Sequence, residues 1–112
     1  MVNKLRTGRY LYIEANPKRS SDALSAFPYR IVLRGSGNNI DYEVAYVIVQ
    51  KTPKGFSAGP FLLMRKYDAI PTILLQCKTE SYARGESRFK LRVLALKIAM
   101  KDKSIEGIVD GL

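Results

Sequence analysis

Cationic and aromatic side chains alternate along several stretches of this sequence. Lysine and arginine neutralise phosphate groups, while tyrosine and phenylalanine rings stack on unpaired bases. Seven tyrosines occur among the 112 residues. This combination suits a nucleic-acid strand, and we expect contacts to it from the following side chains: Arg9, Tyr10, Tyr12, Arg30, Arg34, Phe56, Arg88, Lys90, Arg92, Lys97 and Lys101.

The overall charge points to the same class of partner. Nineteen Lys and Arg stand against ten Asp and Glu, which gives a formal net charge of +9. Such an excess indicates a polyanion. The chain has no histidine, which excludes imidazole bases, Ser–His and Cys–His nucleophile pairs and histidine-bound metals. We therefore expect a binding protein rather than an enzyme, with no cofactor and no metal.

Length and composition predict one domain that spans residues 1–112. The apolar fraction of 46% and the charged fraction of 26% are normal for a globular protein. The single cysteine, Cys77, cannot form an intramolecular disulfide, and this fits a reducing cytoplasm. No secretory signal and no run of apolar residues long enough for a membrane span is present. We therefore expect a cytoplasmic protein with no membrane partner.

Alternation of apolar and polar residues predicts strands at 9–15, 29–34, 40–51, 61–64 and 72–78. The Gly- and Asn-rich segment 35–39 predicts a hairpin turn between the second and third strands. The Pro- and Gly-rich segment 52–60 is a predicted loop that carries Phe56, and short helical turns are expected near 22–27 and 104–112. The fold class is mostly β: a small barrel or sandwich of five to six strands with one or two short helices.

The stretch from Arg88 to Lys101 decides how five of the cations are arranged. Its Leu, Ala, Lys and Met content favours a helix, yet helical spacing yields no single apolar face. As a strand with a bulge near Val93–Leu94, it directs all five cations away from the core. We predict the bulged strand. The alternative is an α+β fold with a C-terminal helix at about 87–101, in which the cations scatter to two sides.

A second set of residues suits metal-dependent cleavage of nucleic acid. Gln76, Cys77 and Lys78 end an apolar strand, and Asp41 follows a Gly- and Ser-rich segment. This arrangement resembles that of the PD-(D/E)XK nucleases. The resemblance implies that Asp41 binds Mg²⁺ and that Lys78 positions the attacking water. The family's usual strand carboxylate is replaced here by Gln76.

The leading hypothesis is a non-catalytic protein that binds single-stranded DNA or RNA. Single strands are preferred because tyrosines are interleaved with cations and no recognition helix is evident. The first alternative is the nuclease that uses Asp41 and Lys78. The second is a structural or interaction protein of a viral or ribonucleoprotein assembly, in which exposed sheet edges support homo-oligomers.

Overall fold

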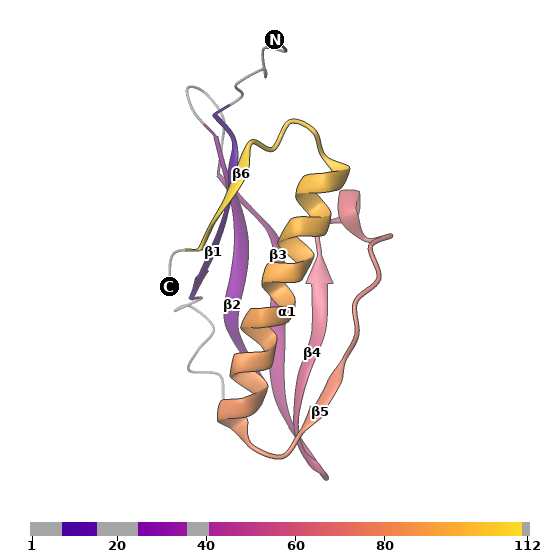
Figure 1. The fold of residues 1–112 in the computed structure, drawn as a ribbon. Helices are drawn as coiled ribbons and strands as arrows, with labels where there is room; N and C mark the ends of the chain where they lie inside the picture. The colour runs from indigo at the N-terminus through magenta and orange to yellow at the C-terminus, as the bar shows by residue number, and fades with distance from the viewer. Residues whose placement is uncertain (1–7, 16–24, 36–40, 111–112) are drawn as a thin grey trace.

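The computed structural model combines one six-stranded sheet with one long helix (Figure 1). It describes residues 8–15, 25–35 and 41–110. The elements in chain order are β1 (Tyr10–Ala15), β2 (Ser25–Arg34), β3 (Tyr42–Thr52), β4 (Gly55–Leu63), the 3₁₀ turn η1 (Arg65–Tyr67), β5 (Leu75–Cys77), α1 (Glu80–Lys101) and β6 (Gly107–Asp110). The predicted mostly-β class with up to six strands is confirmed, and the sheet has the form of a half-barrel.

The strands follow the order β5-β4-β3-β2-β1-β6. All neighbours are antiparallel except β1 and β6, which are parallel. The predicted pairing of the second and third strands is confirmed as β2–β3, while most of the turn predicted between them lies outside the described residues. Since β6 pairs with β1, the sheet joins segments from near the two ends of the described chain.

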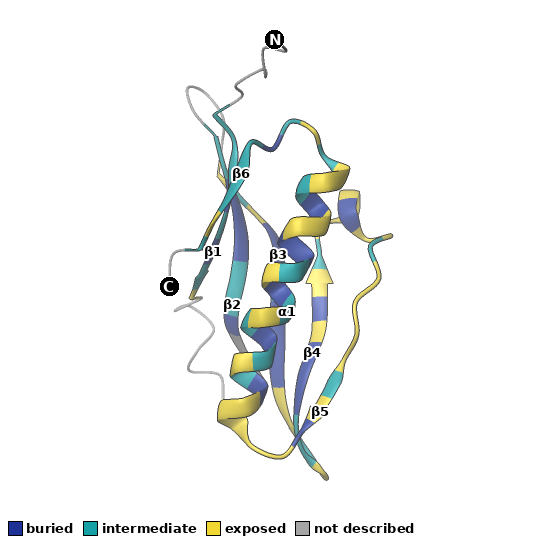
Figure 2. Ribbon diagram, viewed as in Figure 1, coloured by how far each residue is buried: buried dark blue, intermediate teal, exposed yellow. Residues whose placement is uncertain are grey.

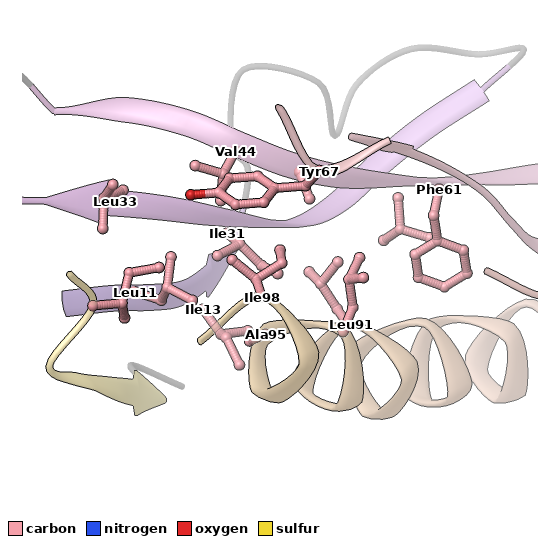
Figure 3. Packing of buried hydrophobic residues seen from close by; sticks show 14 residues of the cluster. Leu11, Ile13, Ile31, Leu33, Val44, Phe61, Tyr67, Leu91, Ala95 and Ile98 are labelled. Carbon is pink, nitrogen blue, oxygen red and sulfur yellow. The ribbon is translucent and has the colours of Figure 1, made fainter. Parts of the chain in front are cut away.

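The core lies between the sheet and α1, which crosses one face of the sheet (Figure 1). Alternate residues of β1 and β2 point toward the helix, and Leu11, Ile13 and Ile31 are fully buried there. The helix contributes the other half of this core (Figure 3) through the following residues: Leu91, Leu94, Ala95 and Ile98. Burial of each large apolar side chain stabilises the fold by about 1.5–3 kcal/mol, so this layer fixes where α1 lies.

The strand predicted for Arg88–Lys101 is wrong, because the segment belongs to α1. The helix begins after Thr79, whose side-chain oxygen accepts a hydrogen bond from the backbone N–H of Tyr82 at 3.2 Å. The alternative to that strand, a C-terminal helix at about 87–101, is confirmed, and the helix extends back to Glu80. The segment yields no single apolar face because it has two: one packs on the sheet, and the other faces outward.

Three further expectations fail at strand boundaries. In place of the predicted loop 52–60, a tight turn at 53–54 joins β3 to β4. The strand β4 begins at Gly55 and includes the rest of the predicted loop. Gly55 has φ +133°, and a side chain there would collide with the carbonyl oxygen of Cys77, so only glycine fits. Within the helical turn predicted near 104–112, residues 107–110 form β6 instead, which is held by pairing with β1. Of the helical turn predicted near 22–27, residues 25–27 belong to β2, and residues 22–24 lie outside the described part of the chain.

Within the described ranges, no helix is both long enough and apolar enough to cross a membrane.

Leu91→Ala tests the core between α1 and the sheet. Leu91 is fully buried, so the truncation should leave a cavity and lower the free energy of unfolding by about 2–5 kcal/mol. Leu62→Ala is the control, because Leu62 is 40% exposed on β4 and should lose much less. Urea unfolding followed by circular dichroism measures both variants. Equal losses in the two would contradict the placement of α1.

Candidate nucleic-acid interface

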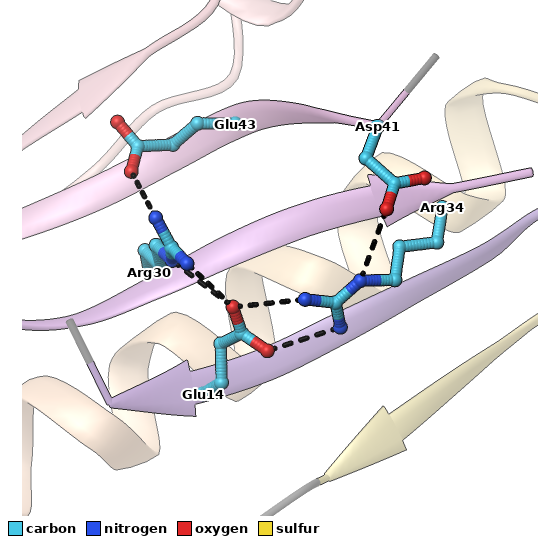
Figure 4. A network of polar contacts seen from close by, with 5 residues as sticks. All are labelled: Glu14, Arg30, Arg34, Asp41 and Glu43. Atoms are coloured by element: carbon cyan, nitrogen blue, oxygen red, sulfur yellow. Dashed lines mark hydrogen bonds and ion pairs between the residues drawn. The ribbon is translucent and has the colours of Figure 1, made fainter. Parts of the chain in front are cut away.

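The face of the sheet turned away from α1 carries a network of charged side chains (Figure 4). Glu14 on β1 is the shared acceptor: its Oε1 lies 2.8 Å from Nη2 of Arg30, and its Oε2 lies 3.0 Å from Nη1 of Arg34. Arg30 also lies 3.6 Å from Glu43, and Arg34 lies 3.4 Å from Asp41. Two cations are thus matched by three carboxylates, and this face gains no local positive charge from them.

The electrostatics of this network favour the ionised pairs. Burial alone would raise the pKa of Glu14, but hydrogen bonds from Arg34 and Arg30 lower that pKa below its ordinary value. The hydrogen bond to Glu14 likewise raises the pKa of Arg34. The Arg34 guanidinium also lies 4.8 Å from the ring centroid of Tyr12, a cation–π contact. The predicted phosphate contacts of Arg30 and Arg34 stay predictions, and both side chains already have carboxylate partners.

A second polar network ties Arg9 to the end of α1. Arg9 donates to Oγ of Ser104 at 2.9 Å and to the Tyr42 hydroxyl at 3.0 Å. Ser104 in turn donates to Oδ1 of Asp102 at 2.6 Å, and the buried Tyr67 donates to Oδ2 at 2.7 Å. Burial would raise the pKa of Asp102, but these donors hold it well below its usual range. Arg9, which directly precedes β1, therefore links the start of this strand to the loop after α1.

The three aromatic residues predicted to stack on bases are all half-buried. The Tyr10 ring lies against Gly107, and the Tyr12 ring lies beneath Arg34. Phe56 was expected in a loop but lies on β4, packed against a small cluster that contains Cys77. The stacking role of these residues stays a prediction.

The five cations of the segment 88–101 divide as the helical alternative predicts. Arg88 points to the β6 side, where its Nη2 lies 2.7 Å from Oδ1 of Asp110. Lys90 and Lys97 lie on the β4 side, together with Lys101 one turn later. Within the described part of the chain, no ion pair to a carboxylate is formed by any of these four: Lys90, Arg92, Lys97 and Lys101.

A groove of about 140 Å³ separates α1 from the segment that leads into β5. Lys90 and Lys97 line this groove, and its remaining lining is mostly apolar: Phe61, Pro71, Thr72, Ile73, Val93 and Leu94. An apolar slot between two ammonium groups can receive a flat ring while the ammonium groups meet anions beside it. Sequence patterns did not identify this groove, because the strand predicted for 88–101 would have directed the lysines elsewhere. Helical spacing of Lys90, Lys97 and Lys101 was the available signal.

The residues of the nuclease hypothesis lie far apart. Gln76 pairs with Ser57, which pairs with Gln50 on β3. Asp41 directly precedes β3, and Gln50 lies nine residues further along the chain, so roughly 30 Å separate the two levels of the sheet. Asp41 contacts Arg34, whereas Gln76 donates to Oγ1 of Thr52 at 2.8 Å.

The described residues also hold no group of three His, Cys, Asp or Glu side chains that could bind a metal ion. The Cys77 thiol is buried, and this burial, with the charge of Glu86, raises its pKa.

No protein-family model, no curated protein and no solved structure matches this chain.

The charged network around Glu14 predicts a pH dependence of stability. Because the pKa of Glu14 is lowered in the folded state, its contribution is complete above the unfolded value of about 4.3 and is lost as pH falls below it. Asp102 acts in the same direction. Glu14→Gln should lower the free energy of unfolding by about 1–2 kcal/mol at pH 7, with a smaller difference at pH 3.

Urea midpoints at pH 7 and pH 3 measure this difference. Asp68→Asn is the control, because Asp68 is exposed and lies outside the network. If the Glu14→Gln variant has the same urea midpoint as the unmodified protein at pH 7, the network contributes nothing to stability.

Proposed function

We propose that this chain is a non-catalytic protein that binds single-stranded nucleic acid along the lysine row of α1, defined as Lys90, Lys97 and Lys101. The observation that carries the proposal is the row itself: three ammonium groups beside an apolar groove, none of which pairs with a carboxylate of the described residues. Like charges on one side of a helix repel each other, and anions from a bound partner offset this repulsion. A phosphate backbone supplies such anions.

The dimensions of the lysine row suit several successive phosphates. At a rise of 1.5 Å per residue, Lys90 and Lys101 lie roughly 16 Å apart along the helix axis. A stacked strand carries one phosphate about every 3.4 Å, so the row spans about four or five nucleotides. The groove lies beside the row, with Phe61 and Leu94 in its lining. A base that has left the stack presents two apolar faces to such a surface.

Single strands fit this surface better than duplexes. A duplex keeps its bases stacked inside, where an apolar groove cannot reach them. Reading base edges from the major groove requires polar side chains on an exposed helix face. The outward face of α1 instead presents Tyr82, Phe89, Leu96 and Met100. A cytoplasmic location belongs to the same proposal and rests on the single free thiol of Cys77.

Replacement of Lys90 and Lys97 by glutamine tests the proposal. The unmodified protein should bind a labelled single-stranded oligonucleotide with affinity that falls roughly tenfold or more between 50 and 200 mM salt. Each lost phosphate contact lowers the slope of log affinity against log salt by about 0.7 for a single strand. The double variant should therefore bind more weakly and show a slope smaller by about 1.4. Fluorescence anisotropy measures both quantities.

The matched control is Lys51→Gln with Lys54→Gln, which removes the same charge from exposed sites at the β3–β4 turn. It should keep the slope of the unmodified protein. Equal losses in the two double variants would show that net charge alone attracts the strand. Absence of binding at low salt, or tighter binding to duplex, would overturn the proposal.

A further inference from the structure

The outward face of α1 carries a stripe of large apolar side chains that no described residue covers. Tyr82 is 61% exposed, Phe89 59%, Leu96 52% and Met100 72%. Together with the half-buried Val93, these residues form the outer stripe. Figure 2 shows exposed and buried parts alternating along the whole helix. Soluble monomers rarely expose a contiguous apolar surface of this kind, so the stripe indicates a partner.

The spacing of the stripe is that of a seam between two helices. Residues 82, 86, 89, 93, 96 and 100 follow one another in alternating steps of four and three, and all of them except Glu86 are apolar. This period of 3.5 keeps side chains facing one partner helix along their whole length. The core uses a separate face of α1, whose buried residues include Leu91 and Ile98. The outer stripe is therefore free for a second helix without disturbing the fold.

We propose that the outer stripe pairs with the same stripe of a second copy of this chain, with the two helices antiparallel. The charges of α1 favour this orientation. Its two acidic residues, Glu80 and Glu86, lie in the first two turns, where Glu80 is paired with Arg84. Lys97 and Lys101 lie in the last two turns. Antiparallel pairing brings Glu86 of each helix toward Lys97 of the other, and it also opposes the helix dipoles. Parallel pairing would set like charges together.

Two-fold symmetry makes such a contact self-complementary. With the axis at the level of Leu91, Phe89 of one copy meets Val93 of the other, and Tyr82 meets Met100, whose sulfur packs well against aromatic rings. Glu86 then lies near Lys97 of the second copy. Lys90 and Arg92 lie on opposite flanks of the seam near its middle. Each of them approaches the same residue of the second copy. Because these like charges and the net charge of +9 repel, added salt should strengthen the dimer.

The proposed dimer does not rest on the proposed function. It does affect how the proposed binding surfaces are arranged. In an antiparallel pair, the flank of one helix that carries Lys90 and Lys97 lies beside the same flank of the other. Both lysine rows then lie on one side of the dimer. A single strand could then pass from one row to the other, and each row would make the same contacts that it makes in a monomer.

Light scattering after size exclusion tests the oligomeric state without nucleic acid. We expect a mass of twice 12.6 kDa, with the dimer fraction rising with protein concentration and with salt. Leu96→Glu with Met100→Glu should give the monomer mass at concentrations where the unmodified protein is dimeric. The matched control is Ile73→Glu with Leu74→Glu, which adds the same charge at exposed apolar sites outside the stripe and should stay dimeric. Circular dichroism establishes that each variant is folded.

Cysteine cross-linking tests the orientation and does not depend on disruptive substitutions. In a Cys77→Ala background, Tyr82→Cys with Met100→Cys should form covalent dimers on oxidation, whereas Tyr82→Cys alone should not. Cross-linking by the single Tyr82→Cys variant would overturn the antiparallel arrangement. A monomer at all concentrations and salts, or a dimer that survives Leu96→Glu with Met100→Glu, would overturn the proposal. So would a mass that doubles only after an acidic peptide or an oligonucleotide is added.

Discussion

The packing of one face of α1 against the sheet is the interaction on which the other features depend. The sheet offers one apolar face, and α1 is the helix that covers it among the described residues (Figure 3). The helix begins at the Thr79 cap, and its end is held by Asp102, whose carboxylate accepts hydrogen bonds from Tyr67 and Ser104. Together these contacts fix the orientation of α1 about its own axis. That orientation decides which lysines face the groove and which apolar residues face outward.

Most strands could be predicted because they obey a simple rule. Where one sheet face is buried, as at Leu11 and Ile13, apolar and polar residues alternate and the strand is visible in the sequence. The helix could not be predicted in this way, because residues such as Leu91 and Leu96 are both apolar but serve opposite faces. Two apolar faces on one helix cancel the periodic signal that a single face would give.

The candidate site was only partly predictable for a different reason. A sequence shows which residues are cationic, but not which carboxylates they will meet. Arg30 and Arg34 both form ion pairs with Glu14: the register of β1 and β2 sets Arg30 opposite Glu14, and the Arg34 side chain reaches Glu14 from its place opposite Tyr10. That register depends on the whole sheet. Arginines supply most of the ion pairs found, through planar groups that can hold several oxygens. Among the described residues, Lys90, Lys97 and Lys101 of α1 form no ion pair to a carboxylate.

The parallel pairing of β1 with β6 has a kinetic consequence. Tyr10 lies opposite Gly107, so this contact closes a loop that contains nearly all the described chain. Contacts between residues so distant in sequence form slowly, because the chain loses much entropy before the contact stabilises it. The β2–β3 and β3–β4 hairpins are local by comparison. Attachment of β6, with the link from Asp110 to Arg88 on the helix, is therefore expected to be a late event in folding.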